Sequence, residues 1–196
     1  MGLVGRLSFI LFMCVGLFPV ANGQCDSVYM ETDPFDSSFI ATVPHFNVGY
    51  MVPSNFQTID GYKMVEEGKI QLSYGAKDTV GGIYLSLFLA ERNFLTIQEG
   101  MGNIMALLES GKVVSLYNIS DRGEFDKSTN MRVYHHTALI PLDLFYLMTI
   151  DPIEKIRVYY DKGIKRTIEI TPAQKERFDT ALQCLGDAVG LFKKKP

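Results

Sequence analysis

The residues from Ile83 to Ala90 alternate between two sets of side chains, and this pattern limits the fold more than any other part of the sequence. One set is aliphatic and the other is mixed: Ile83, Leu85, Leu87 and Leu89 against Tyr84, Ser86, Phe88 and Ala90. Successive side chains of a β-strand point to opposite faces of a sheet, so a period of two predicts a strand. Because both sets are rather apolar, we expect this strand in the centre of a sheet.

The same alternation predicts further strands along the chain. They are expected at 39–43, 46–51, 70–74, 94–98 and 131–140. Two hairpins are also expected, one with strands at 103–109 and 112–118 and one with strands at 156–160 and 165–170. The first turns at Ser110-Gly111, where glycine is free to take positive φ. We expect a turn from Gly75 to Asp78, extended by Gly81-Gly82, and a polar loop over 119–130.

The C-terminal segment carries the signature of a helix. Thr171 and Gln174 have the spacing of a capping box, and Pro172 stands at the first helical position. Apolar residues follow at helical spacing and form one stripe: Phe178, Ala181, Leu182, Leu185, Val189 and Phe192. The pattern predicts a helix over 171–193 that covers one face of the sheet. A shorter helix is expected at 142–150, where Pro141 precedes the first turn.

Together these elements predict the fold class. We expect an α+β domain made of an antiparallel sheet or a partly open β-sandwich, covered by the long C-terminal helix. No repeat and no linker rich in Pro, Gly or Ser interrupts the chain after its N-terminal segment. A single β-rich domain over 24–196 is therefore the simplest interpretation.

The N-terminal segment is typical of a signal peptide. Arg6 is followed by an apolar stretch from Leu7 to Ala21, which is shorter than the roughly 20 residues of a membrane-spanning helix. Ala21 and Gly23 place small residues before Gln24, as a cleavage site requires. We expect residues 1–23 to be removed and the product to be secreted or periplasmic, without a membrane span; an uncleaved anchor is the alternative.

Two of the three cysteines remain after this cleavage. Cys25 and Cys184 allow one intramolecular pairing in an oxidising compartment, which would join the mature N-terminus to the last helix. The alternative is a pair of free, buried thiols. Neither cysteine belongs to a Cys-x-x-Cys pair, so redox catalysis has no support.

Composition excludes one class of partner. The formal charge is −3 and the pI is about 5.6, so the chain has no basic surplus for neutralising phosphates, and nucleic acid is not an expected partner. A hydrophobic fraction of 47% and a charged fraction of 21% are those of an ordinary globular protein, which excludes wholesale disorder.

Candidate functional side chains are few. His135 and His136 are neighbours on a predicted strand, so they point to opposite faces and do not favour a shared metal. Asp121, Glu124 and Asp126 lie together in one polar loop, where carboxylates can act as acids or bases or hold calcium. A solvated loop explains the three acids equally well.

Tyr159 and Tyr160 are the candidates for a binding surface, since exposed tyrosines suit recognition; core packing is the alternative. The sequence has no Gly-x-Ser-x-Gly elbow, no complete dinucleotide-binding loop and no P-loop. We therefore expect no cofactor, no metal and no catalytic residue.

The segment from Gly102 to Cys184 resembles uncharacterised exported bacterial domains. The resemblance rests on the hairpin MALLESGKVVSLYN, the helix PLDLFYLMTID, the strand PIEKIRVYY and a closing helix that carries a cysteine. It implies a bacterial envelope setting and supplies no activity, ligand or catalytic residue.

The main functional hypothesis is an exported, non-catalytic binding or structural module that contacts an envelope or extracellular partner, either a protein, a glycan or another envelope component. A second hypothesis is a carrier that holds an apolar small molecule between sheet and helix, with methionines lining the cavity. A third is a hydrolase whose site joins His135 or His136 to the loop 121–126, which requires a cleft that brings these side chains within hydrogen-bond reach.

Overall fold

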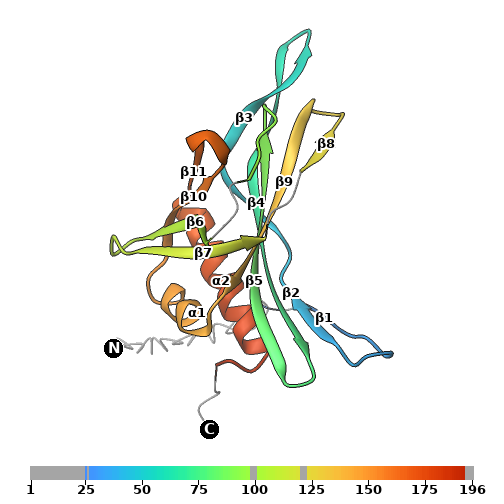
Figure 1. Cartoon of the computed structure of the whole chain (residues 1–196), viewed down its shortest axis with the longest axis vertical. Helices are drawn as coiled ribbons and strands as arrows, with labels where there is room; N and C mark the ends of the chain where they lie inside the picture. The colour runs from blue at the N-terminus through green and yellow to red at the C-terminus, as the bar shows by residue number, and fades with distance from the viewer. Residues whose placement is uncertain (1–24, 26, 98–100, 120–122, 193–196) are drawn as a thin grey trace, which may run out of the picture.

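The structure, a computed structural model, describes residues 25, 27–97, 101–119 and 123–192 (Figure 1). The predicted signal peptide, residues 1–23, and Asp121 lie outside the described residues. The β-strands are β1 (Tyr29–Thr32), β2 (Phe39–Thr42), β3 (Phe46–Thr58), β4 (Gly61–Lys77), β5 (Val80–Glu91), β6 (Met101–Leu108), β7 (Val113–Ile119), β8 (Glu124–Asp126), β9 (Met131–Ile140), β10 (Ile153–Tyr159) and β11 (Lys165–Glu169). The helices are α1 (Leu142–Met148) and α2 (Pro172–Ala188), and a 3₁₀ turn, η2 (Asp161–Gly163), joins β10 to β11.

These strands form one open antiparallel sheet, as the α+β prediction requires. The 11 strands follow the order β1-β2-β4-β5-β9-β7-β6-β10-β11, with β3 paired to β4 and β8 paired to β9. Among the residues that the structure describes, two pairs join β7 to β9, so this part of the connection between the two halves of the sheet is narrow. In Figure 1 both helices and strands β6, β7, β10 and β11 lie on one side of the layer formed by β4, β5 and β9.

Several predicted strands and hairpins are confirmed. Strand β9 has the predicted ends, and β5 contains the alternating segment in the centre of the sheet. The β6–β7 hairpin turns through Gly111, which has a φ of +84°. The β10–β11 hairpin turns through η2, where Lys162 and Gly163 both have positive φ. The predicted strand at 94–98 is wrong for its described part, because only Ile97 makes an isolated bridge, to Tyr160.

The turn predicted from Gly75 to Asp78 is also wrong in its position. Strand β4 continues to Lys77, and Gly75 pairs with Gly82 inside the β4–β5 ladder. A methyl group at Gly82 would lie 3.0 Å from the Tyr84 hydroxyl. Gly82 therefore makes room for the tyrosine two positions along its own strand, and neither Gly75 nor Gly82 forms the turn.

The polar loop predicted over 119–130 is wrong in part. Within it, Glu124, Phe125 and Asp126 form strand β8, which pairs with Val133, Arg132 and Met131 of β9. Asp126 organises the turn that follows, because its carboxylate accepts hydrogen bonds from the Ser128 backbone N–H at 2.8 Å and from the Thr129 hydroxyl at 2.8 Å. Hydrogen bonding by a local acid therefore forms a short hairpin here.

Helix α2 begins with the predicted capping box. The Gln174 N–H donates to Thr171 Oγ1 at 3.4 Å, and the Thr171 N–H donates to Gln174 Oε1 at 2.9 Å. The helix ends at Ala188 and not at residue 193, because Gly190 takes a φ of +72° and the N–H of Leu191 donates to the Gly186 carbonyl at 2.8 Å. This is a Schellman ending. It turns Phe192 back onto Phe145, with ring centroids 5.8 Å apart.

The apolar stripe of α2 packs into the core. Phe178, Leu182 and Leu185 are at most 2% exposed, and the Phe178 ring lies edge-on to Phe46 of β3 at 6.1 Å. These contacts seal the helix onto the sheet along the stripe, and a depression of about 430 Å³ lies beside it between α2 and residues 43–46. Each of these three burials contributes about 1.5–3 kcal/mol to the free energy of folding.

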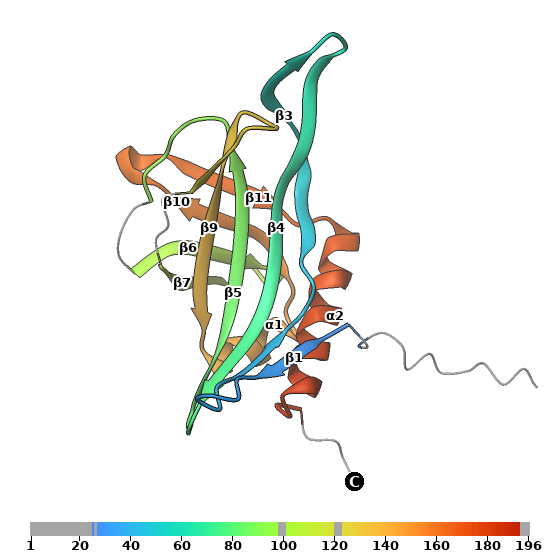
Figure 2. The ribbon, with the colours of Figure 1, turned by 90° about the vertical axis from the view of Figure 1, so that its right-hand side faces the viewer.

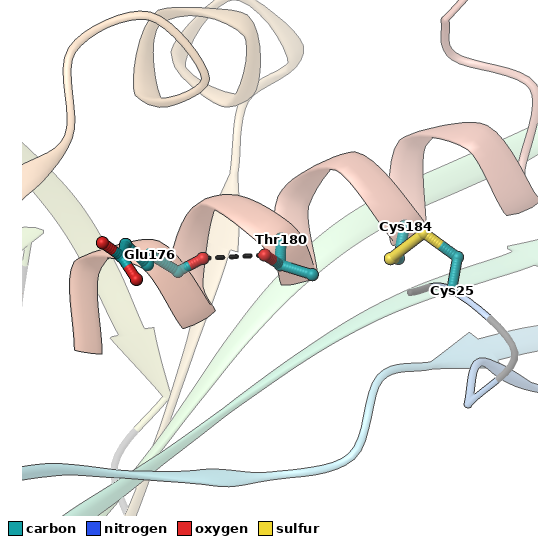
Figure 3. Close-up of a disulfide and its surroundings, with 4 residues drawn as sticks. All are labelled: Cys25, Glu176, Thr180 and Cys184. Atoms are coloured by element: carbon teal, nitrogen blue, oxygen red, sulfur yellow. Dashed lines mark hydrogen bonds between the residues drawn. A yellow bond between two sulfur atoms is a disulfide. The ribbon is translucent and has the colours of Figure 1, made fainter. Parts of the chain in front are cut away.

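A disulfide joins Cys25 to Cys184 on α2, as the pairing hypothesis expects (Figure 3). The two Cα atoms are 5.0 Å apart, and 159 positions separate the residues in sequence. Cys184 lies at the edge of the apolar stripe of α2. Its side chain is 3% exposed, so this edge of the stripe is also buried. The bond ties the beginning of the described chain to its last helix.

Candidate functional site

The face of β4, β5 and β9 that points away from the helices carries the surface features best suited to binding. We name it the outer face, and Figure 2 looks onto it. Three rows of paired residues define it: Ser73, Tyr84 and Leu139; Gln71, Ser86 and Thr137; and Lys69, Phe88 and His135. The alternate residues of the same strands, such as Leu72, Leu85 and Ala138, are buried on the inner face.

A cleft of about 460 Å³ lies on the outer face between the β3–β4 hairpin and the β8–β9 hairpin. We name it the hairpin cleft. Its apolar lining residues are Met51, Met64, Val65, Phe88, Ala90 and Val133. Lys63, Lys69 and Asp126 are among its polar lining residues. Met51 and Met64 are both 49% exposed, so the cleft presents two flexible thioether side chains to solvent.

Hydrogen bonds between the two hairpins hold the cleft in shape. The Asn55 N–H donates to the Thr129 carbonyl at 3.1 Å, and Lys63 Nζ donates to the Ser128 carbonyl at 3.1 Å. Asn55 Nδ2 also donates to the Arg92 carbonyl at 2.6 Å, while Arg92 Nε donates to Asn55 Oδ1 at 2.8 Å. The walls are therefore fixed before any ligand arrives, which lowers the entropy cost of binding.

His135 and Asp126 are the two sequence candidates nearest to this cleft. His135 stacks on Phe88, with ring centroids 4.4 Å apart and an interplanar angle of 11°. Asp126 lines the cleft, and its pKa is lowered mainly by the hydrogen bond from Thr129. Both groups thus have defined structural partners: His135 supports the aromatic wall and Asp126 supports the turn.

The structure separates Asp126 from the histidines and places Glu124 on the strand beside His135. His135 and His136 point to opposite faces, as predicted, and His136 is fully buried. Asp126 pairs with Met131, which is four positions along β9 from His135, or about 13 Å at the rise of an antiparallel strand. This separation exceeds hydrogen-bond reach. Glu124 is exposed on β8, where it pairs with Val133, two positions along β9 from His135, so Glu124 and His135 are diagonal neighbours on one face.

His136 belongs to an interior chain of polar side chains. Asn118 Nδ2 lies 3.0 Å from His136 Nδ1, and His136 Nε2 lies 3.2 Å from the Tyr160 hydroxyl. With the Asn118 amide as donor, His136 Nδ1 accepts and Nε2 carries the proton toward Tyr160. Tyr160 is 0% exposed, so its assignment to a binding surface is wrong. The reason is that the inner face of this strand end packs into the core.

The series of interior polar contacts extends from Tyr160 to Glu91. Glu91 and Glu67 both contact the guanidinium of Arg166. Arg166 Nη2 lies 2.8 Å from Glu67 Oε1, and Arg166 Nε lies 3.5 Å from Glu91 Oε1. Burial raises the pKa of Glu91, against the lowering effect of Arg166. Burial is also the main cause that raises the pKa of Tyr160, with Glu91 adding to it. These contacts join β4, β5 and β11.

Tyr159 lies apart from all of these groups. Lys165 Nζ lies 5.4 Å from the centroid of its ring, across the β10–β11 hairpin.

Among the described residues, no group of three His, Cys, Asp or Glu side chains is placed to hold a metal ion. Neither α1 nor α2, the helices of the described chain, is long and apolar enough to cross a membrane.

Sequence reasoning did not single out Met51, Met64 or Arg166. The alternation from Ile83 to Ala90 places Phe88 and Tyr84 on one face, and that was the available signal for the outer face. Met51 and Met64 come together only through the irregular β3–β4 ladder, whose register shifts after Val48 and again after Pro53. No protein-family model matches the chain, and no curated protein or solved structure matches it either.

Proposed function

We propose that the chain is an exported, non-catalytic binding module of the cell envelope, and that the hairpin cleft receives an apolar side chain of a partner protein. The observation that carries the proposal is the pair of half-exposed methionines, Met51 and Met64, on a cleft whose walls are braced by Asn55 and Lys63. Methionine adapts its shape to apolar ligands, and a braced cleft loses little entropy on binding.

Two further observations support this proposal. The Cys25–Cys184 disulfide suits an oxidising compartment, which agrees with a secreted or periplasmic location and with the N-terminal signal sequence. His135, His136 and Asp126 have structural roles: His135 stacks on Phe88, His136 belongs to the interior polar contacts, and Asp126 holds the turn after β8. A binding role therefore has more support than the hydrolase or the carrier.

Methyl NMR tests the cleft directly. The protein is labelled with ¹³C-methyl methionine and titrated with nine-residue peptides whose central residue is Leu, Phe or Met, beside a peptide with central Ser. We expect saturable shifts of the Met51 and Met64 methyl signals with the apolar peptides and no shift of Met148, which is 0% exposed in the core.

Two charge-introducing variants complete the test. Met64→Glu should abolish the Met51 shift, because a carboxylate in the cleft would lose its hydration when the peptide binds. Met30→Glu changes a methionine of similar exposure, 54%, on β1 and should leave binding unchanged. Unshifted Met51 and Met64 signals with every peptide, or equal binding by Met64→Glu, would overturn the assignment of the cleft.

A further inference from the structure

A second depression lies on the outer face at the opposite end of β4 and β5. It has a volume of about 700 Å³, and we name it the glycine depression after Gly75 and Gly82 in its floor. One row of paired residues crosses four strands from the rim into the floor: Glu31 on β1 at the rim, then Ile40 on β2, Gly75 on β4 and Gly82 on β5. At about 4.8 Å between strands, this row spans about 14 Å.

The two glycines let an aromatic ring lie on the backbone. A methyl group at Gly82 would lie 3.0 Å from the Tyr84 hydroxyl and 3.2 Å from Cζ, and one at Gly75 would lie 3.6 Å from Cε2. The hydroxyl end of Tyr84 therefore occupies the space that a side chain at Gly82 would need, and the edge of its ring contacts β4 at Gly75. Glycine inside a strand often marks a site of close ligand approach. Tyr84 is partly exposed and lines the depression, so it offers the ligand a rigid apolar platform.

Carboxylates stand at the rim beside this platform. Glu31 and Asp33 line the depression from β1 and the turn that follows it. Glu31 Oε2 accepts the Tyr29 hydroxyl at 2.6 Å, which holds the side chain in place. Lys77 also lines the depression, and its Nζ lies 2.8 Å from Asp36 Oδ2, so the positive charge is paired. The rim therefore offers hydrogen-bond acceptors and repels anions.

From this arrangement we propose that the glycine depression binds a neutral oligosaccharide. One face of a sugar ring carries C–H groups that pack on an aromatic face, while its hydroxyls donate to carboxylates in charge-assisted hydrogen bonds. The length of the floor suits more than one sugar ring. A quaternary ammonium ligand would need a cage of aromatic rings. This depression is open, and its two lining rings, Tyr84 and Phe39, belong to different strands and are fewer than the several rings of a cage, so the saccharide is the better fit.

Fluorescence of an introduced tryptophan tests the proposal. The chain contains no tryptophan, so Tyr84→Trp places a single indole in the depression. The variant is titrated with cellohexaose, maltohexaose and chitohexaose, and choline is the cationic comparison. We expect a saturable change in emission with at least one oligosaccharide and none with choline. The same oligosaccharide should show saturation transfer to its sugar protons with the unmodified protein.

Three variants of the unmodified protein locate the binding. Tyr84→Ala should weaken it at least tenfold, Tyr84→Phe should retain it within threefold, and Glu31→Gln should weaken it about fivefold through loss of a charge-assisted hydrogen bond. Tyr159→Ala removes a tyrosine outside the depression and should bind as the unmodified protein does. Thermal melting confirms that each variant is folded.

The result separates this inference from the proposed function. Met64→Glu should bind the oligosaccharide normally, since the hairpin cleft and the glycine depression share no lining residue in the described chain. Binding of none of the three oligosaccharides, saturable binding of choline, or oligosaccharide binding that survives Tyr84→Ala would each overturn the saccharide site, whatever the peptide titrations show.

Discussion

Glu91 combines burial and charge in a way that makes a pH prediction. Its pKa is raised by burial, so the folded state holds the proton more tightly than the unfolded chain does. The tighter proton binding adds to the free energy of unfolding. This contribution is fully present below the ordinary pKa of 4.5 and is lost as the pH rises through the higher pKa of the folded state. The free energy of unfolding of the unmodified protein should therefore fall as the pH rises above 4.5. In the Glu91→Gln variant this fall should be smaller, because an amide does not titrate.

Urea unfolding between acid and neutral pH measures this effect. Glu124→Gln is the matched control, because it makes the same change on an exposed strand, and its profile should follow that of the unmodified protein. Arg166 keeps its 2.8 Å contact with Glu67 in the Glu91 variant, so the interior retains a partner for the guanidinium. Parallel profiles for Glu91→Gln and the unmodified protein would show that Glu91 has no raised pKa.

At the scale of the elements, Gln174 links helix α2 to the sheet. Besides completing the capping box, Gln174 Nε2 donates to the Gly49 carbonyl at 2.9 Å and Gln174 Oε1 accepts the Gly49 N–H at 3.2 Å. Gly49 has a φ of +74° at a bulge where β3 shifts register against β4. One amide therefore fixes the bulge and the start of the helix together.

This double role predicts unequal effects of two alanine variants. Thr171→Ala removes one capping hydrogen bond and should cost about 1 kcal/mol of unfolding free energy. Gln174→Ala also removes both bonds to Gly49 and should cost about 3 kcal/mol. Chemical denaturation measures both values. If the two variants lose the same stability, the link to the bulge contributes nothing.

The elements also show which parts of the structure could be predicted from local sequence. Strand β9 and the start of α2 were predicted because alternation and capping chemistry are local signals. The turn at Gly75 was misplaced because the pairing of Gly75 with Gly82 of the next strand is not visible in the local sequence. The hairpin cleft was not predicted for the same reason: Met51 and Phe88 meet only after β3, β4 and β5 pair.

At the scale of the whole molecule, contacts between distant segments hold together the two parts of the sheet that meet at β7 and β9. In the described part of the chain two residue pairs join β7 to β9, and further contacts hold the layers together. The Arg166–Glu67 ion pair connects β11 to β4, and the buried stripe of α2 contacts β3 through Phe46. The Cys25–Cys184 bond then anchors the other end of α2 to the beginning of the described chain. Stability is thus distributed over distant parts of the chain, which favours cooperative unfolding.

The disulfide supports the last prediction, which also tests export. Closing a loop across 159 positions limits the unfolded chain and stabilises the folded protein by at most about 5 kcal/mol. The double variant Cys25→Ser, Cys184→Ser should therefore unfold at lower urea, and reductant should shift the unmodified protein in the same direction. Intact-mass analysis of the exported protein should give residues 24–196, and reduction should add one hydrogen to each sulfur. A mass that retains residues 1–23 would contradict signal cleavage, while two free thiols in the exported protein would contradict the bond.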